Sequence, residues 1–298
     1  LDRKKGGLFM VPGNAYGTTK GGMRFLLRDI ISNKTLFQRS EKPYVVMMGT
    51  NIIFNMDLNT IIEAHENSGA QMTVVYCKAT RNVDDETTPE INENGRLTGV
   101  SAGVAYGDNA SMDCCIVNRE TLLEIIDHYQ AADYLDLLEA LQGDFGNIDV
   151  CSYEYKGEVV GVFSEKSLYR RSMDLLDQTV ADQLFDPERP ILTKAHDVPP
   201  SRYATGSHAC NSIISAGCII KGTVRNSILS RGVVVEEGAS VTNSIINQSC
   251  IIKSGARVEN AILDKNNVVP TNTELRGTPE NILVLGKAPL TSDTTIVR

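Results

Sequence analysis

The sequence predicts a Rossmann-like α/β domain followed by a left-handed parallel β-helix. Two observations support this prediction: short apolar runs alternate with amphipathic helical segments as far as residue 177, and aliphatic residues repeat with a period of six after residue 211. Between these regions, Pro residues at 187, 190, 199 and 200 break both helix and strand. The expected organisation is therefore an α/β domain at 1–177, a linker at 178–210, and a β-helix with a C-terminal tail at 211–298.

Alternating patterns place the elements of the first part. Thr18–Thr19 is expected to cap a helix whose apolar positions are Met23, Leu26, Leu27, Ile30 and Ile31. The next helix is expected to begin at Asp57 or Asn59 and to end at Gly69. The other expected elements are strands at 44–48, 72–76, 114–117 and within 149–163, a hairpin turn at 93–95, and helices at 119–129, 134–142 and 168–177. Strands that alternate with helices of about ten residues indicate a largely parallel, doubly wound sheet.

A hexapeptide repeat predicts the β-helix. The blocks N-S-I-I, N-S-I-L, N-S-I-I and N-A-I-L begin at residues 211, 226, 243 and 260. Aliphatic residues advance in steps of five or six positions, at Leu229, Val235, Val241, Ile246, Ile252, Val258, Leu263, Val269 and Leu275. Smaller residues accompany them at Cys218, Val233, Ala239, Cys250, Ala256 and Thr273. Each six-residue unit would form one flat side of a triangular coil, and the coils must stack to bury these residues.

The composition limits the classes of partner. The 298 residues carry a formal net charge of -8, so a nucleic-acid partner is not expected. No apolar run approaches the ~18 residues that a membrane helix needs, and no signal peptide opens the chain. The seven Cys, without C-x-x-C spacing, favour reduced thiols in a cytoplasmic protein, and the four His form no metal-binding pair.

Seven segments carry a resemblance to a known family: G-T at 17–18, V-V-M-M-G at 45–49, S-M at 111–112, M-D-L-L at 173–176, R-P-I-L-T at 189–193, P-P at 199–200 and N-S-I-I-S-A-G-C-I-I at 211–220. Together they resemble the ADP-glucose pyrophosphorylase (glucose-1-phosphate adenylyltransferase) family over nearly the whole chain. The resemblance implies a nucleotidyltransferase fold and a reaction that joins glucose 1-phosphate to ATP with Mg²⁺, releasing pyrophosphate.

The chain departs from this family in two respects. The family opens with a strand and a nucleotide-binding loop, G-G-x-G-x-R-L, and no such loop occurs in the 298 residues, so a first segment is expected to be missing here. In addition, Thr50 stands where the resemblance implies a metal-binding Asp, and Asp113 stands where it implies Gly. The implied sugar-phosphate Lys is absent, since no Lys lies between Lys78 and Lys156, and V-V-G-V-F-S at 159–164 lacks the second implied Asp.

These departures predict a regulatory, catalytically impaired subunit of the GlgD type, which would activate a catalytic homologue in glycogen biosynthesis. We expect a vestigial sugar-nucleotide pocket without catalytic residues or metal ligands, formed by Gly17, Thr18, Gly49, Thr50, Asn51, Ser111 and Asp113. No cofactor is expected in this chain, although the active relatives use Mg²⁺. The expected partners are the catalytic homologue, a second copy of the chain, or both, in at least a dimer that involves the β-helix.

Three alternative functions remain open from the sequence. The chain could be an active nucleotidyltransferase that uses hydroxyl and amide ligands or a shifted carboxylate, such as Asp57 or Asp113. It could be a hexapeptide-repeat acyltransferase, although these enzymes need a His base and residues 211–275 contain none; His208 lies just before them. It could also bind a sugar-phosphate or nucleotide effector at the expected helix N-terminus, Thr18–Thr19, beside Lys20.

Overall fold

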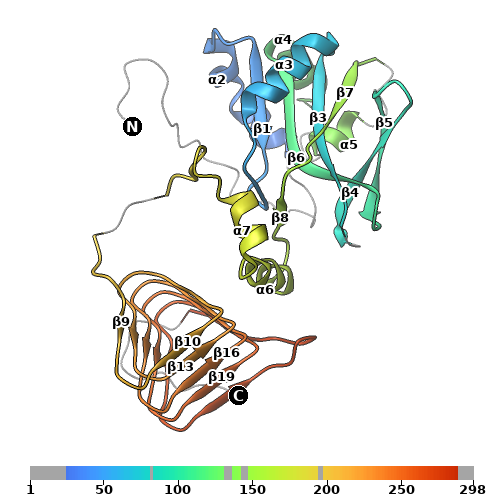
Figure 1. Ribbon diagram of the computed structural model, residues 1–298. Coiled ribbons are helices and arrows are strands. Elements are labelled where there is room, and N and C mark those ends of the chain that lie inside the picture. Colours follow the sequence, from blue (N-terminus) through green and yellow to red (C-terminus); the bar gives the residue numbers. More distant parts are fainter. Residues whose placement is uncertain (1–24, 81–82, 131–135, 142–146, 194–196, 288–298) are drawn as a thin grey trace. The chain divides into compact units, whose positions relative to one another are not determined.

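The computed structural model describes residues 25–80, 83–130, 136–141, 147–193 and 197–287 (Figure 1). The chain divides into two compact units. The α/β unit comprises Leu1–Ile52 and Met56–Val159, and the β-helix unit comprises Ile53–Asn55 and Val160–Arg298. The division after Val159 lies earlier in the chain than residue 177, because the helix at Glu165–Asp174 packs against the β-helix.

A four-stranded mixed sheet forms the centre of the α/β unit, with the order β1-β6-β3-β7 (Figure 1). These strands are β1 (Tyr44–Met48), β6 (Asn109–Asn118), β3 (Met72–Lys78) and β7 (Val150–Glu154). Strand β7 is parallel to β3, whereas β6 is antiparallel to both β1 and β3. The sequence predicts a largely parallel sheet. Strands β1, β3 and β7 do run in the same direction, whereas β6 runs in the opposite one. Strand β6 follows a hairpin instead of a crossover helix, so the chain enters the sheet from the opposite end.

The α/β unit contains five described helices, one of which is capped at both ends. They are α1 (Leu27–Ser32), α2 (Lys34–Arg39), α3 (Leu58–Ser68), α4 (Arg119–His128) and α5 (Leu137–Leu141). The side chain of Asp57 accepts a hydrogen bond from the backbone N–H of Asn59, and Gly69 ends α3 with a φ of 64°. Asp57 is therefore the cap, which settles the choice between Asp57 and Asn59. The hairpin of β4 (Val83–Ile91) and β5 (Leu97–Val104) confirms the turn predicted at 93–95.

Within the described residues, helix begins at Leu27, two residues after the described part of the chain starts. The predicted cap, Thr18–Thr19, lies outside the described residues, and α1 begins only at Leu27. Phe25 is not part of a helix: its N–H donates to Asp136 Oδ2 (2.6 Å) and its carbonyl accepts from the N–H of Leu137 (2.9 Å). A carboxylate 111 residues away in the sequence thus competes with helix formation at this position.

The β-helix consists of three parallel sheets, one on each side of a triangular coil (Figure 1). Face 1 is formed by β9 (Arg202–Tyr203), β12 (Ile219–Ile220), β15 (Val234–Val235), β18 (Ile251–Ile252) and β21 (Val268–Val269). Face 2 is formed by β10 (His208–Cys210), β13 (Thr223–Arg225), β16 (Ser240–Thr242), β19 (Arg257–Glu259) and β22 (Glu274–Arg276). Face 3 is formed by β11 (Ile213–Ile214), β14 (Ile228–Leu229), β17 (Ile245–Ile246), β20 (Ala261–Leu263) and β23 (Leu283–Leu285). The coils therefore begin at Arg202, and His208 belongs to the first coil instead of the linker.

The interior of the coils confirms the predicted repeat. All nine predicted aliphatic residues, from Leu229 to Leu275, are buried. The predicted small residues are buried as well, except Thr273, which is partly exposed. Together with Ile220 and Val224 they form one continuous apolar cluster. Since each coil contributes to this cluster, the stability of the β-helix depends on contacts between neighbouring coils.

Asparagines stack along the corner between faces 2 and 3. Four of them, Asn211, Asn226, Asn243 and Asn260, adopt positive φ values between 43° and 49°, a conformation that Asn tolerates better than most residues. Asn211 Nδ2 donates to Asn226 Oδ1 across a spacing of 15 residues, and Asn226 Nδ2 donates to Asn243 Oδ1 across 17 residues. The coils thus differ in length by two residues without breaking this stack.

The difference in coil length is absorbed at the corner between faces 1 and 2. Two residues, Lys221 and Gly222, connect β12 to β13, whereas four residues, 236–239, connect β15 to β16. A Cβ atom on Gly222 would lie 2.2 Å from the carbonyl oxygen of Ala239, so the shorter corner requires glycine.

Helix α6 (Glu165–Asp174) covers part of face 3. Ser164 and Ser167 form a capping box at its start. The hydroxyl of Tyr169 donates to the carbonyl oxygen of Asn243 (2.7 Å), and its ring packs with Ile245 and Ile262. Helix α7 (Gln178–Leu184) follows, and Asn55 Nδ2 donates to the carbonyl oxygens of Leu184 and Arg189. Strands β2 (Ile52–Phe54) and β8 (Val159–Gly161) pair as a separate two-stranded sheet.

Ile246→Ala should lower the free energy of unfolding by about 2–5 kcal/mol, because Ile246 is fully buried between coils. Ile213→Ala is the matched control, since this outward-facing isoleucine of the same sheet is 41% exposed, and it should cost less than about 1 kcal/mol. Urea denaturation measures both values. Equal losses in the two variants would contradict the inward and outward assignment of the hexapeptide positions.

Candidate functional site

The predicted site lies where β1 ends against the middle of β6. Gly49 follows β1, and its N–H donates to the carbonyl oxygen of Asp113 (2.7 Å). The N–H of Asp113 in turn points to Ser111 Oγ (3.3 Å). The structure therefore brings together three of the predicted residues, which come from two adjacent strands.

Asp113 occupies an irregularity in β6. Opposite β3, Val75 pairs with Cys114 and the next residue, Tyr76, pairs with Ser111, so β6 carries two residues that β3 does not match. Met112 and Asp113 are these two residues, and Asp113 adopts a φ of 44°. The left-handed region is unfavourable for residues with a Cβ atom, although Asp is among those that tolerate it best. The backbone at this point has the conformation that glycine adopts most readily.

The side chain of Asp113 closes the space beside Gly49. A Cβ atom on Gly49 would lie 2.8 Å from Asp113 Cβ and 3.4 Å from Asp113 Oδ2. Gly49 is therefore the one residue type that fits against Asp113 without a shift of the backbone. Asp113 is 8% exposed, so its carboxyl group is largely shielded from water.

The buried thiols behind Asp113 are poor nucleophiles. Burial, together with the smaller effect of the nearby charge of Asp113, raises the pKa of Cys114 to about 12. Burial also raises the pKa of Cys115 well above its usual value. Because the thiolate is the reactive form, neither cysteine is suited to covalent catalysis at neutral pH.

The remaining predicted site residues are less closely assembled. Thr50 is exposed and Asn51 is partly buried in the bend between β1 and β2. Gly17 and Thr18 lie outside the described residues. Asp57, the alternative carboxylate, is engaged as the cap of α3. The end of β1 thus presents the hydroxyl group of Thr50, the amide group of Asn51 and one carboxylate, that of Asp113.

This donor set does not fit a divalent metal ion of the kind that nucleotidyl transfer requires. Mg²⁺ prefers carboxylate oxygens, and the described strand end supplies one carboxylate, which is packed against Gly49. Across the described parts of the chain, no group of three or more His, Cys, Asp or Glu side chains could hold a metal ion. We therefore derive no catalytic step through a metal at this position.

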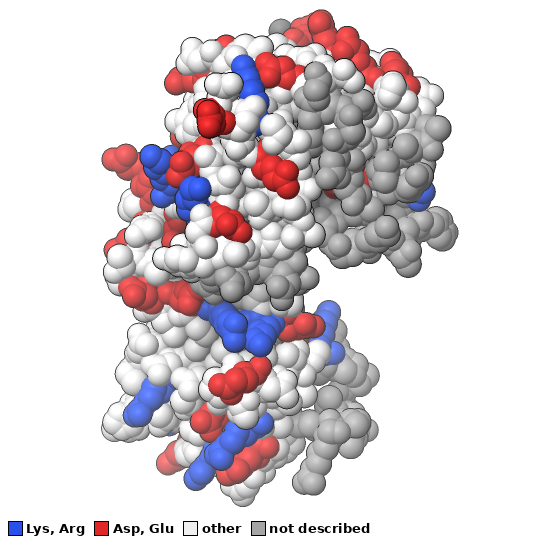
Figure 2. Space-filling view, turned by 90° about the vertical axis from the view of Figure 1, so that its right-hand side faces the viewer, with Lys and Arg blue, Asp and Glu red and all other residues white. Residues whose placement is uncertain are grey.

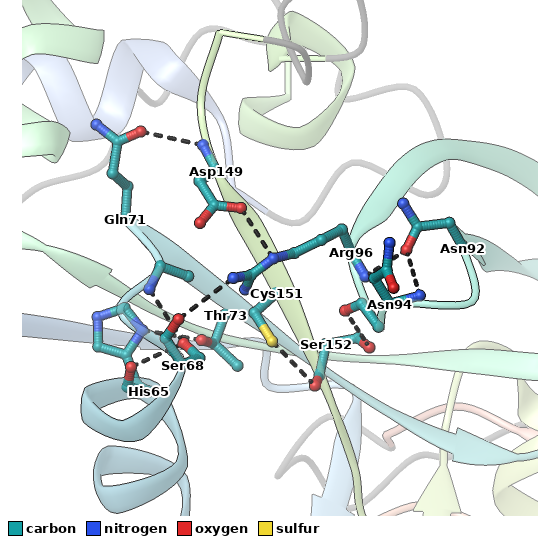
Figure 3. Close-up of polar contacts among 12 residues, drawn as sticks. His65, Ser68, Gln71, Thr73, Asn92, Asn94, Arg96, Asp149, Cys151 and Ser152 are labelled. Carbon is teal, nitrogen blue, oxygen red and sulfur yellow. Dashed lines mark hydrogen bonds and ion pairs between the residues drawn. The ribbon is translucent and has the colours of Figure 1, made fainter.

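A polar network beside the sheet was not predicted from the sequence. Arg96, at the tip of the β4–β5 hairpin, reaches Asp149 Oδ1 with Nε (3.1 Å) and the carbonyl oxygen of Ser68 with Nη2 (3.2 Å) (Figure 3). The backbone N–H of Arg96 donates to Asn92 Oδ1. Buried His65 binds Thr73 Oγ1 through Nδ1 (2.8 Å), which joins α3 to β3 (Figure 3). These contacts fix the hairpin and α3 to the sheet, and they explain Arg96 and His65 as structural residues.

A hollow lies elsewhere in the α/β unit. Its volume is about 300 Å³, and it is lined by Gln71, Thr121, Glu124, Ile125, His128, Tyr129, Asn147 and Ile148. None of the predicted site residues contributes to it. Ser111 instead borders a void of about 10 Å³ between apolar side chains of the sheet and the hairpin, so its surroundings are closely packed.

The surface charge agrees with the acidic composition. Figure 2 shows Asp and Glu side chains spread over the upper part of the view, with Lys and Arg side chains interspersed among acidic ones on this face. On face 2 of the β-helix, Arg276 pairs with Glu259 (2.9 Å) and Arg257 with Glu274 (3.7 Å). Among the described helices, none is long and apolar enough to cross a membrane.

Gly49→Ala should lower the free energy of unfolding by about 1–3 kcal/mol, because the new Cβ atom would overlap Asp113. In an Asp113→Gly background the same substitution should cost less than about 1 kcal/mol, since the opposing Cβ atom is gone. Urea denaturation of the four proteins in this double-mutant cycle gives the coupling. Gly286→Ala, which has no neighbour within 4 Å, is the control for glycine replacement itself. Additive losses would show that Asp113 does not oppose a side chain at position 49.

Comparison with known proteins finds relatives of both units. Residues 198–281 match the family model described as GlmU-like, C-terminal hexapeptide. The chain is 30% identical over 294 residues to the glycogen biosynthesis protein GlgD of Bacillus subtilis (strain 168), which covers 96% of the chain and 75% of that protein. It is 30% identical over 244 residues to GlgD of Geobacillus stearothermophilus, covering 81% of the chain and 62% of that relative.

A glucose-1-phosphate adenylyltransferase is similar to the chain to the same degree. The chain is 31% identical over 303 residues to this enzyme from Halalkalibacterium halodurans, covering 96% of the chain and 77% of the enzyme. The matches extend through the α/β unit and the β-helix, so they concern the whole arrangement and not the repeat alone. The chain therefore belongs to the family of glucose-1-phosphate adenylyltransferases and the related GlgD proteins.

Proposed function

We propose that this chain is a regulatory, catalytically impaired subunit of an ADP-glucose pyrophosphorylase in glycogen biosynthesis. It would assemble with a catalytic homologue that makes ADP-glucose from glucose 1-phosphate and ATP, and it would raise the activity of that homologue. The family membership and the similarity to GlgD proteins support the pathway. The observation that carries the impaired role is the packing of Asp113 against Gly49 at a strand end without a metal-binding donor set.

The first argument concerns charge neutralisation. Nucleotidyl transfer develops negative charge on phosphate oxygens, which a metal ion held by carboxylates normally stabilises. Thr50 and Asn51 carry no charge, so neither can replace such a carboxylate. Loss of one stabilising group of this type typically costs about 3–4 kcal/mol of transition-state stabilisation, which corresponds to a factor of about 10²–10³ in rate.

The second argument concerns the substrate. Glucose 1-phosphate is an anion, and the resemblance to the family implies that a Lys holds its phosphate. No Lys lies between Lys78 and Lys156, whereas Asp113 adds a carboxylate close to the strand end. A negative charge in a poorly hydrated place repels a second one strongly. The same strand end would therefore disfavour binding of the substrate as well as catalysis.

The third argument concerns what is retained. The described α/β unit keeps its central sheet and the capped helix α3, and the β-helix keeps a continuous core. A subunit that acts through contacts with a homologue needs this scaffold but not its own chemistry. Retention of the fold together with loss of the donors is the combination expected of a regulatory partner.

Co-expression with the catalytic homologue of the same source organism tests the regulatory role. We expect a complex that survives purification and an ADP-glucose synthesis rate several-fold above that of the homologue alone. Pyrophosphate release by this chain alone should remain at background. Absence of a complex and of any activation would refute the proposed role, and substantial activity of the chain alone would favour the active nucleotidyltransferase instead.

Restoring one carboxylate should not restore catalysis. Thr50→Asp is expected to leave pyrophosphate release from glucose 1-phosphate and ATP at the background of the unmodified chain, because the Lys and the second Asp remain absent and Asp113 remains in place. The same substitution should leave activation of the catalytic homologue unchanged, which serves as the control for folding. Strong activity of this single variant would mean that the other three departures matter less than argued.

A further inference from the structure

The hollow of about 300 Å³ in the α/β unit lies at the edge of the central sheet opposite to Gly49. Gly49 follows the end of β1, which runs parallel to β3 and β7. The hollow is instead lined by residues that lead into β3 and β7, namely Gln71, Asn147 and Ile148, and by one face of α4. It is therefore separate from the predicted sugar-nucleotide pocket, and the proposed function assigns no role to it.

Thr121 of α4 brings a hydroxyl group without a partner to the floor of this hollow. The residue is only 6% exposed, and its hydroxyl group forms no hydrogen bond with any described residue. Among the described residues, no wholly enclosed side-chain oxygen or nitrogen atom lacks a partner, so this hydroxyl group opens onto the hollow that Thr121 lines. An unbonded hydroxyl group in a largely buried place is unfavourable unless water or a ligand binds to it.

Gln71 supplies hydrogen-bond donors in a fixed orientation. Its Oε1 accepts from the N–H of Asp149 (3.0 Å), and its backbone N–H donates to the carbonyl oxygen of Asp149 (2.9 Å). Arg96 in turn holds the carboxylate of Asp149 (3.1 Å). Figure 3 shows the side-chain nitrogen of Gln71 on the side away from Asp149. Because the oxygen of this amide is engaged, the group that Gln71 offers to a ligand is its NH₂, which donates two hydrogen bonds.

The rest of the lining combines a carboxylate with an apolar wall. Glu124 lies exposed at the rim and supplies the carboxylate, and His128 lies one turn further along the same face of α4. Ile125, which is 3% exposed, and the partly buried Ile148 and Tyr129 supply the apolar surface. The ring of His128 packs edge-on against that of Tyr129, with 4.7 Å between the ring centres. Apolar walls with a few convergent polar groups are typical of small-molecule sites.

This lining disfavours several classes of ligand. None of the residues that line the hollow is Lys or Arg, and both Glu124 and the C-terminal end of α4 contribute negative potential, so a phosphate-bearing ligand is disfavoured. A metal ion is disfavoured as well, since a single carboxylate borders the hollow. An amide recognises adenine through both its oxygen and its nitrogen, and the oxygen of Gln71 is already bound to Asp149.

We propose that this hollow binds an uncharged pyranose sugar. Each hydroxyl group of such a sugar both donates and accepts, so the sugar can bind the NH₂ of Gln71, the hydroxyl group of Thr121 and the carboxylate of Glu124 together. The C–H face of the sugar ring is apolar and fits against Ile148 and Tyr129. The volume equals that of about ten water molecules, which is enough for one or two pyranose rings. The sugar is either a free hexose or the end of an α-glucan chain.

Saturation-transfer NMR of the full chain, titrated with D-glucose and separately with maltotriose, tests the proposal. Because the contacts are few and the rim is open, we expect a dissociation constant of about 1–5 mM for D-glucose. Tighter binding of maltotriose would identify the end of an α-glucan chain as the ligand, and equal constants would identify a single sugar. Inorganic phosphate and ethanolamine should not displace either sugar, since the site recognises hydroxyl groups and not charge.

Glu124→Ala places the sugar in the hollow. This variant should weaken binding at least about 10-fold, because hydrogen bonds to a carboxylate are lost, while alanine keeps the helix. Glu120→Ala is the matched control, since the side chain of Glu120 on the same helix is 85% exposed and does not border the hollow. It should bind both sugars like the unmodified chain.

Thr121→Val distinguishes a role in binding from a role in stability. It should weaken sugar binding about 3–10-fold and leave the thermal midpoint of unfolding unchanged, because the hydroxyl group has no partner among the described residues. Thr73→Val is the matched control, since Thr73 is 1% exposed and its hydroxyl group binds His65 Nδ1 (2.8 Å). This control should lower the midpoint by about 2–4 °C and leave sugar binding unchanged.

Three outcomes would overturn the proposal. The first is no binding of either sugar up to about 50 mM. The second is unchanged binding in both Glu124→Ala and Thr121→Val, since the sugar would then bind elsewhere. The third is displacement of the sugar by inorganic phosphate or ethanolamine, which would make the hollow a site for charged ligands. The catalytic homologue takes no part in these measurements, so their outcome is independent of the proposed function.

Discussion

Strand β6 is hydrogen-bonded along both edges, to β1 and to β3, and it is two residues longer than β3 where they pass each other. The extra residues have no partner in β3, so each must be accommodated separately. Met112 turns into the core, where it is 1% exposed, and Asp113 turns toward Gly49 in a left-handed conformation. The arrangement at the end of β1 follows from this mismatch. Position 49 must be glycine, and the carboxylate of Asp113 lies beside it, shielded from water.

This mismatch also separates the backbone of the strand end from the side chains that it presents. The ladder between β1 and β6 is continuous from Tyr44 to Met48, and the N–H of Gly49 still finds an acceptor in the carbonyl group of Asp113. This hydrogen bond thus does not depend on whether position 113 carries a side chain. The side chain alone determines whether the space beside Gly49 is open or filled, so substitution at one residue can alter ligand binding while stability changes little.

Local patterns predicted those parts of the fold that depend on local interactions. The limits of β1, the cap and end of α3 and the register of the β-helix core were predicted correctly, because apolar periodicity and turn residues determine them directly. The predicted helix does not include Phe25 and Leu26, because Asp136 binds the backbone of Phe25 from a distant part of the chain. The direction of β6 was wrong for a related reason, since a hairpin and not a helix precedes it. The contact between α6 and face 3 was not predicted, because the doubled aliphatic residues at 245–246 and 262–263 do not reveal which segment covers them.

The candidate site was predictable in part. The association of Gly49, Ser111 and Asp113 was anticipated from the resemblance to the family, and the structure brings them together. The left-handed conformation of Asp113 was not anticipated, although replacement of a family glycine by Asp was a usable indication, since Asp and Asn are enriched among non-glycine residues with positive φ. The role of Arg96 could not be inferred, because its partners, Asp149 and the carbonyl group of Ser68, are distant in sequence.

The unequal corners of the β-helix bear on how such a protein can change over evolutionary time. The two-residue difference between coils is confined to the corner between faces 1 and 2, while the strands on either side keep their register. Insertions and deletions are therefore tolerated at this corner, where they alter neither the apolar interior nor the asparagine stack on another edge. A lineage can lengthen one corner into a loop and acquire a new contact there, whereas a single-residue deletion within a strand would turn its aliphatic residue out of the core.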